Sequence, residues 1–177
     1  QALAILVINE VETQLLAGEA PSVEALFIEA CGDLLLDESL DAAMVAEMLR
    51  LPSEDYLAEL ASRTGGANVD TIHQARDAVR TALGAALQES FLARYQRLDN
   101  PQPYTPDGEQ IAHRSLRNIC LSYLVAANPQ NMQLAVEQYR VADNMTDRLA
   151  ALREISFYGD FALREDTLQS FYNDWQH

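Results

Sequence analysis

The three histidines, His73, His113 and His177, are the first residues to test for metal chemistry. A zinc peptidase of the HExxH type needs two histidines one helical turn apart, with a glutamate between them as general base. None of the three has a histidine or cysteine three or four positions away. We therefore interpret them as exposed or half-buried polar residues on helices and predict no metal site.

The two cysteines, Cys31 and Cys120, are the candidates for thiol chemistry. They lie far apart in the sequence and form no CxxC pair. Cys120 falls within an apolar helical face, which is typical of a core residue and not of a nucleophile. The sequence leaves open whether the thiols are free or form one long-range disulfide, and it favours the reduced state of a cytoplasmic protein.

No other cluster has the spacing of a catalytic or ligand-binding motif. The sequence contains no GxxxxGK[ST] or GxGxxG phosphate loop and no GxSxG nucleophile elbow. The acidic loop 99–110 lacks oxygen-bearing residues at alternate positions before a glycine, as an EF-hand requires. We interpret the pairs Asp37–Glu38 and Glu54–Asp55 as helix-start residues that complement the helix dipole. We predict no catalytic, cofactor-binding or metal-binding residue.

All twelve basic residues are arginines, and four of them are candidates for contacts beyond their own helix. Arg114 and Arg117 lie on one expected helix, and Arg148 and Arg153 lie on another. Because the chain also contains 27 Asp and Glu residues, we interpret these arginines as partners in internal ion pairs. The alternative is contact with a neighbouring domain, since arginine is enriched in interfaces.

The formal net charge of -15 limits the partners that the chain can have. Such a chain repels phosphate backbones and anionic membrane surfaces, so we expect neither nucleic-acid nor membrane binding. The apolar run 1–9 is too short to cross a bilayer and lacks the basic region of a signal peptide. Because this run begins without Met and without a capping residue, we expect a fragment cut within an element.

Apolar residues recur at helical spacing along the whole chain, and no stretch has sustained strand alternation. Proline, glycine and capping residues divide the pattern into helices. We predict an all-α fold of antiparallel helical pairs that form a degenerate, HEAT-like, right-handed superhelix. The expected helices are 2–17 (with a strand over 3–8 as the alternative), 22–36, 41–50, one from 53, 69–97, 108–127, 130–142, 144–157 and 162–176.

We expect residues 1–177 to form a single helical domain within a larger C-terminal one. The proline-rich segment 99–108 is a candidate boundary between two subdomains. Within the expected long helix 69–97, Gly84 weakens the helix by about 1 kcal/mol relative to alanine.

Three segments carry a likeness to a known family. They read LLLDESLDAAMVAEMLRLPSE (34–54), IAHRSLRNICLSYL (111–124) and DNMTDRLAAL (143–152), and FYNDW (171–175) follows them. In this order and spacing they resemble the C-terminal helical domain of bacterial aminopeptidase N, in the zinc-dependent gluzincin family. The likeness covers nearly the whole chain.

The resemblance implies a parent enzyme with a β-rich N-terminal domain, a thermolysin-like catalytic domain, a small β-sandwich and this helical domain. In that family a zinc-bound water attacks the first peptide bond and a glutamate acts as base. None of those motifs occurs in this chain, so zinc belongs to the parent and the fragment alone is expected to be inactive and cofactor-free.

The resemblance also implies that this domain walls and closes a cavity that admits short peptides. Its expected partners are the catalytic domain of the same polypeptide and the peptide substrates of the parent. The alternative is a stand-alone helical adaptor that binds a partner peptide in a groove. Knowledge of the residues upstream of this segment would separate the two, since an HExxH motif there favours the enzyme.

Phe171 and Trp175 are spaced i, i+4 and share one face of the last expected helix. In the family such a face would pack against later helices. Left in water, two large aromatic side chains favour association. We therefore expect self-association through Phe171 and Trp175, or fraying of the helix there.

Overall fold

The computed structural model describes residues 2–63, 65–99 and 102–176. All regular structure in these residues is helical, and none of them lies in a strand. The elements are, in chain order, α1 (Ala2–Leu16), α2 (Ala25–Leu36), α3 (Ala42–Leu49), α4 (Glu54–Ser62), α5 (Val69–Ala86), α6 (Gln88–Arg97), α7 (Gly108–Ala127), the short 3-10 helix η1 (Pro129–Asn131), α8 (Met132–Val141), α9 (Met145–Tyr158) and α10 (Phe161–Trp175).

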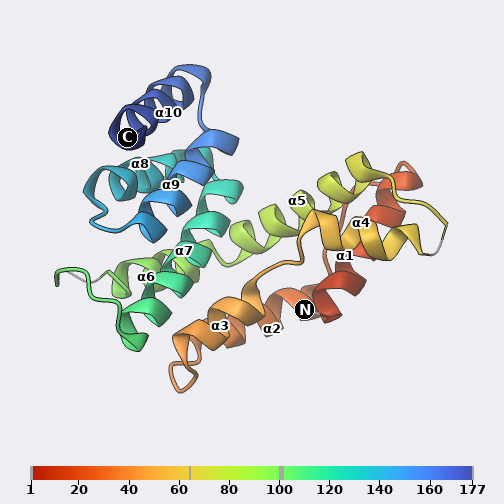
Figure 1. The fold of residues 1–177 in the computed structure, drawn as a ribbon. Helices are drawn as coiled ribbons and strands as arrows, with labels where there is room; N and C mark the ends of the chain where they lie inside the picture. Colours follow the sequence, from red (N-terminus) through yellow and green to blue (C-terminus); the bar gives the residue numbers. More distant parts are fainter. Residues whose placement is uncertain (1, 64, 100–101, 177) are drawn as a thin grey trace.

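Consecutive helices pack against each other, and α7 lies at the centre of the arrangement. The consecutive pairs include α2 with α3, α4 with α5, α6 with α7, and α8 with α9. Helix α7 also contacts α3, α5 and α9, while α1 packs along α5. The helices form a curved body in which α8–α10 make one limb and α1, α4 and the start of α5 make the other (Figure 1). The predicted all-α fold of antiparallel helical pairs is confirmed.

Side-chain caps set the starts of several helices, as the sequence indicates. The Asp41 carboxylate accepts hydrogen bonds from two backbone amides at the start of α3. Ser53 caps α4, and Asn144 Oδ1 accepts from the Asp147 amide at 2.9 Å. These side chains satisfy amide groups that have no partner within the first turn of a helix. Helix α7 has the bounds that the sequence predicts.

The prediction of one long helix over 69–97 is wrong, because the chain bends at Leu87 between α5 and α6. Leu87 has φ -110° and ψ 21°, outside the α-helical region. The bend lets two helices share one neighbour. Gly84 of α5 lies against the backbone of Tyr123, while Phe91 of α6 stacks on the Tyr123 ring with 4.7 Å between ring centroids.

The hydrophobic core continues from one side of the 99–108 segment to the other. One cluster of buried side chains extends from Ala4 in α1 to Ile155 in α9. Helices α6 and α7, on either side of the segment, pack against each other. Residues 100 and 101 lie outside the described residues, and the division into subdomains stays a prediction. No helix in the described part of the chain is long and apolar enough to cross a membrane.

Gly84 marks the closest approach of α5 to α7. A Cβ atom at this position would lie 2.3 Å from the carbonyl oxygen of Tyr123 and 2.8 Å from the Cβ of Ala127. The first of these is a backbone atom, which cannot rotate away as a flexible side chain could. The contact therefore requires glycine, although glycine disfavours the helix.

We expect Gly84→Ala to lower the free energy of unfolding by about 2 kcal/mol, since overpacking outweighs the gain of about 1 kcal/mol in helix propensity. Urea denaturation followed by circular dichroism measures the change. Gly108→Ala is the matched control, because a Cβ there would meet nothing within 4 Å. Its free energy of unfolding should stay within about 0.5 kcal/mol of the parent or rise. Equal stability of the two variants would contradict the proposed contact.

Candidate functional site

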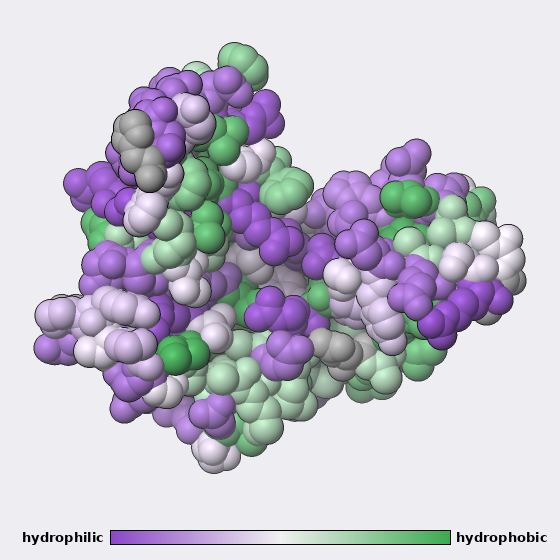
Figure 2. All heavy atoms as spheres, in the orientation of Figure 1, coloured by the Kyte–Doolittle hydropathy of each residue, from purple (hydrophilic) through white to green (hydrophobic). Residues whose placement is uncertain are grey.

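A cleft of about 260 Å³ lies between α5, α7 and α9 and is bordered by the end of α3. We call it the arginine cleft, because Arg50, Arg76, Arg80 and Arg153 line it. Among the described residues that line it, Glu154 is the one acidic residue. Figure 2 shows the molecule hollowed between its two limbs, with hydrophilic side chains around the hollow. Four cations in one cleft contrast with the net charge of -15 of the chain.

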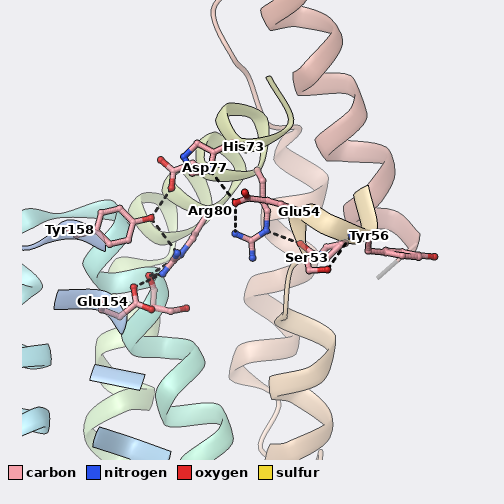
Figure 3. A network of polar contacts seen from close by, with 11 residues as sticks. Ser53, Glu54, Tyr56, His73, Asp77, Arg80, Glu154 and Tyr158 are labelled. Atoms are coloured by element: carbon pink, nitrogen blue, oxygen red, sulfur yellow. Dashed lines mark hydrogen bonds and ion pairs between the residues drawn. The ribbon is translucent and has the colours of Figure 1, made fainter. Parts of the chain in front are cut away.

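Arg80 and Glu154 form a buried ion pair at this cleft (Figure 3). Arg80 Nη2 donates to Glu154 Oε2 at 2.6 Å, and the two side chains are 10% and 6% exposed. Arg80 also donates from Nη2 and Nε to the carbonyl oxygen of Ser122 on α7, at 2.8 and 3.2 Å. One guanidinium therefore joins α5, α7 and α9.

Tyr158 extends this network back to α5. Arg80 Nη1 donates to the Tyr158 hydroxyl at 3.2 Å, and that hydroxyl donates to Asp77 Oδ1 at 2.7 Å. The Arg80 guanidinium also lies over the tyrosine ring, 5.2 Å from its centroid. Burial, followed by the bond to Asp77, raises the pKa of Tyr158 to about 12. The hydroxyl therefore stays protonated and keeps its role as a donor.

Burial raises the pKa of the Glu154 carboxyl, while the charge of Arg80 and its hydrogen bond oppose the rise. The cost of removing the carboxylate from water therefore exceeds the attraction of its partner. Because the folded-state pKa is raised, the stability that Glu154 contributes is greatest at acidic pH and falls as pH rises through that pKa. The pair holds three helices together at an electrostatic cost.

Arg76 and Arg153 bring two further positive charges to the cleft. Arg76 Nε donates to the carbonyl oxygen of Pro52 at 2.7 Å, and its Nη1 lies 3.9 Å from Glu54 Oε1. Burial lowers the pKa of Arg76, and the charges of Arg80 and Arg153 add to that lowering. Arg153 is exposed, with its guanidinium 5.9 Å from the centroid of the Phe157 ring.

A second polar network joins α7, α8 and α9 beside the cleft. The Asp147 carboxylate accepts hydrogen bonds from Asn118 at 2.8 Å and from Asn144 at 2.9 Å. Gln138 Nε2 donates to Asn118 Oδ1 at 2.8 Å and to the Asp147 carbonyl at 2.9 Å. Asp147 is buried, so it does more than complement the start of α9. This network fixes how the three helices meet.

The two described histidines, His73 and His113, lie on different helices. His73 is exposed and lies 3.1 Å from Glu54 Oε1, while His113 is half-buried on α7. Their interpretation as exposed or half-buried helix residues is confirmed, and His177 lies outside the described residues. No group of three or more His, Cys, Asp or Glu side chains among the described residues could hold a metal ion. The absence of cofactor and catalytic residues stays a prediction.

Both cysteines are free and buried. The interpretation of Cys120 as a core residue is confirmed, since its side chain is fully buried on α7. Burial raises the pKa of the Cys31 thiol to about 11 and that of Cys120 to about 12. Neither thiol is therefore ionised near neutral pH, which leaves both poor nucleophiles.

The interpretation of Asp37 and Glu38 as helix-start residues is wrong. Asp37 caps the C-terminal end of α2, and its carboxylate accepts hydrogen bonds from the amide and hydroxyl of Ser39. Glu38 forms an ion pair with Arg97 of α6. Asp37 and Glu38 therefore belong to the turn between α2 and α3 and do not begin a helix. Glu54 and Asp55, by contrast, lie in the first turn of α4 as predicted.

The four arginines singled out in the sequence have different partners. Arg117 forms the predicted kind of internal ion pair, 3.1 Å from Asp99. The ion-pair interpretation is wrong for the others among the described residues: Arg114 lies over the Tyr104 ring and donates to the carbonyl of Thr105, Arg148 donates to the carbonyl of Ala142, and Arg153 lies near the Phe157 ring. Contact with a neighbouring domain stays a prediction for all four.

Sequence reasoning missed Arg76, Arg80 and Glu154. Their signal was the i, i+4 spacing of the two arginines along the edge of the α5 stripe that contains Val79 and Leu83. Nothing in the spacing indicates that α9 supplies the countercharge, because the pair is 74 residues apart.

Comparisons with known proteins agree along the whole chain. A family model described as "Domain of unknown function (DUF3458_C) ARM repeats" matches residues 1–177. Aminopeptidase N of Escherichia coli (strain K12) is 32% identical over 159 residues, or 89% of this chain and 18% of that protein. Aminopeptidase N of Haemophilus influenzae is 31% identical over 160 residues, or 90% of this chain and 18% of that protein. The chain thus spans about 18% of the length of these relatives.

A solved structure has the same fold. The crystal structure of Legionella pneumophila aminopeptidase A in complex with aspartic acid matches with a TM-score of 0.80 and 22% identity. The match covers 98% of this chain and 21% of that one. At this identity the likeness concerns the fold alone.

We expect Arg80→Met to lower the free energy of unfolding by about 3–5 kcal/mol at pH 7, because it leaves the Glu154 carboxylate buried without a partner. The loss should be smaller at acidic pH, because protonation of Glu154 removes the unpaired charge. Urea denaturation at both pH values measures this. In the double variant Arg80→Met/Glu154→Met, at least half of the stability should return. A double variant as unstable as the single one would contradict the ion-pair account.

Proposed function

The chain belongs to the ARM-repeat family whose model it matches from end to end, and from this premise we propose that it is the helical domain of a zinc aminopeptidase. The parent enzyme removes N-terminal amino acids from peptides. This domain walls and closes the substrate cavity and catalyses no step itself. The observation that carries the proposal is the similarity to aminopeptidase N over 89% of the chain.

The chain matches only part of the length of its relatives, which supports a separate catalytic domain elsewhere in the polypeptide. Because the chain spans about 18% of aminopeptidase N, the rest of such a polypeptide has room for a catalytic domain. That domain supplies the zinc and the general base, and its peptide substrates are the other partners of the chain. We propose a cytoplasmic location for the enzyme.

The shape of the molecule suits a wall. The curved stack of helices presents a hollow face between its two limbs (Figure 2). Such a surface, built on one continuous hydrophobic core, is suited to limit the size of a substrate. Short peptides pass into the space beside it, and folded proteins do not.

The second candidate function is a stand-alone helical adaptor that binds a partner peptide. The arginine cleft favours it, because a concave site with several cations is suited to a peptide ligand. The two functions differ in what the longer polypeptide does. An adaptor has no peptidase activity in any length of the gene product.

We expect the 177-residue chain alone not to hydrolyse alanine 4-nitroanilide, and the longer polypeptide of its gene to do so with loss of activity in a zinc chelator. Absorbance of the released nitroaniline measures the rate. Deleting residues 1–177 from the longer polypeptide should reduce its preference for tetrapeptides over a folded protein substrate. A longer polypeptide without peptidase activity, or one whose preference is unchanged by the deletion, would refute the proposal.

We also propose that the aromatic face of α10 associates with a second copy of the chain. Phe171 and Trp175 lie with ring centroids 6.3 Å apart, and Trp175 is 53% exposed. Tyr172 beside them is exposed as well. Burying such large aromatic side chains is worth roughly 1.5–3 kcal/mol each, which favours association.

We expect the double variant Phe171→Ser/Trp175→Ser to be folded and monomeric at concentrations at which the parent chain forms dimers. Sedimentation velocity measures the association, and circular dichroism checks the fold. Tyr56→Ser, which removes an exposed aromatic side chain from α4, is the control and should leave the dimer intact. A parent chain that is monomeric at 100 μM, about the range of weak association, would disprove this proposal.

A further inference from the structure

The arginine cleft holds more positive charge than its own carboxylate balances. Arg76, Arg80 and Arg153 line the cleft together with Glu154, so three guanidiniums share one cleft with a single described carboxylate in its lining. Arg80 is committed to the buried pair and to Ser122. Arg76 lies near a second carboxylate, with its Nη1 3.9 Å from Glu54 Oε1, whereas the exposed Arg153 forms no ion pair among the described residues and leaves its positive charge unbalanced at the cleft.

Two of these guanidiniums keep donors for a ligand. Among the described residues, Arg76 forms its hydrogen bond through Nε to Pro52, and its Nη1 lies 3.9 Å from Glu54 Oε1, too far for a hydrogen bond, so its Nη groups can still donate to a ligand. Arg153 contacts the Phe157 ring, and no carboxylate or carbonyl oxygen of the described residues forms a hydrogen bond with it. Charge-assisted hydrogen bonds to an anion are the strongest contacts that such groups form.

The walls of the cleft are apolar on the side of α3 and α7. Leu49, Leu51 and Ile119 line it together with Ala150 of α9. A ligand that fits both the arginines and the apolar walls has an anionic group on a short apolar stem, with apolar groups next to it. A bare inorganic ion would leave these walls in water and gain nothing from them.

The charge of the whole chain further restricts the classes of ligand that can bind in the cleft. At a net charge of -15, the chain as a whole repels a polyanion that extends beyond the cleft. Nucleic acids, anionic membranes and strongly acidic peptides are therefore repelled. A single carboxylate flanked by neutral residues is attracted by the arginines of the cleft, and its neutral neighbours are not repelled by the acidic chain.

We propose that the arginine cleft binds a peptide segment of a partner protein through one Asp or Glu side chain. The carboxylate of that side chain accepts hydrogen bonds from Arg76 and Arg153 beside the Arg80–Glu154 pair. The neutral apolar residues on either side of it contact Leu49 and Ile119. This inference goes beyond the proposed function, because it holds for the chain itself, whichever longer polypeptide contains it.

Isothermal titration of the 177-residue chain with acetyl-Ala-Leu-Glu-Leu-Ala-amide tests the proposal. The blocked ends leave the glutamate as the one charge of the probe. We expect saturable binding that becomes about tenfold weaker when the glutamate is replaced by glutamine, since a charge-assisted hydrogen bond is lost. Binding should also weaken with added salt, as expected for an exposed ionic contact.

Arg153→Gln should weaken binding of the glutamate peptide by about tenfold, again through loss of a charge-assisted bond. Arg164→Gln is the matched control. Arg164 also lies 5.9 Å from an aromatic centroid, that of Phe161, but it does not line the cleft. Both variants remove one positive charge, so a general effect of net charge is the same in each. The control should bind within about twofold of the parent.

Three results would overturn the proposal: equal affinity for the glutamate and glutamine peptides, unchanged affinity in Arg153→Gln, or an equal loss in Arg164→Gln. A glutamine peptide with a free C-terminal carboxylate separates a chain end from a side chain. If it binds more tightly than the blocked glutamate peptide, the cleft takes a chain end and the side-chain proposal fails. These outcomes do not depend on peptidase activity, so the proposed function can fail or hold independently.

Discussion

The close approach of α5 to α7 is the contact on which the rest of the structure depends. It requires Gly84, because a side chain there would collide with the carbonyl oxygen of Tyr123. Tyr123 then reaches two more elements from the same position. Its ring stacks on Phe91 of α6, and its hydroxyl donates to the carbonyl of Leu49 at the end of α3 at 2.6 Å. Four helices thus meet at one tyrosine, with no room for an extra methyl group.

The same approach places the polar residues of the arginine cleft. Arg80 lies one turn before Gly84 on α5, and Ser122 directly precedes Tyr123 on α7. With the backbones this close, the guanidinium reaches past α7 to Glu154 on α9 while donating to the Ser122 carbonyl. A wider separation of α5 and α7 would leave both charges buried and apart, at a cost of several kcal/mol. Packing and charge are therefore coupled in this fold.

Local sequence signals predict the elements well, because caps and prolines act within a few residues. Asp41, Ser53 and Asn144 begin their helices as expected, and the bounds of 108–127 are correct. The sequence does not indicate the bend at Leu87, since no proline or glycine stands there and the residues on either side of it contact Tyr123, which is far away in the sequence.

The candidate site was beyond the reach of sequence reasoning for the same reason. The cleft draws its lining from α3, α5, α7 and α9, so its charges come together only when the order of packing is known. The sequence singled out Arg153 but not Arg80, whose place beside Val79 in an apolar stripe hides a buried cation. Glu38 was misread because its partner, Arg97, is 59 residues away.

The attachment of α10 has a consequence for the dynamics of the molecule. Among its described residues only Thr167 is buried, and the helix packs mainly against α9. Helix α7, in contrast, buries seven residues among five neighbouring helices. From this difference in burial we expect α10 to be a separate cooperative unit whose amides exchange through a local opening of low free energy. We expect the amides of α7 to exchange only when the whole core opens, so that unfolding begins at the C-terminal helix.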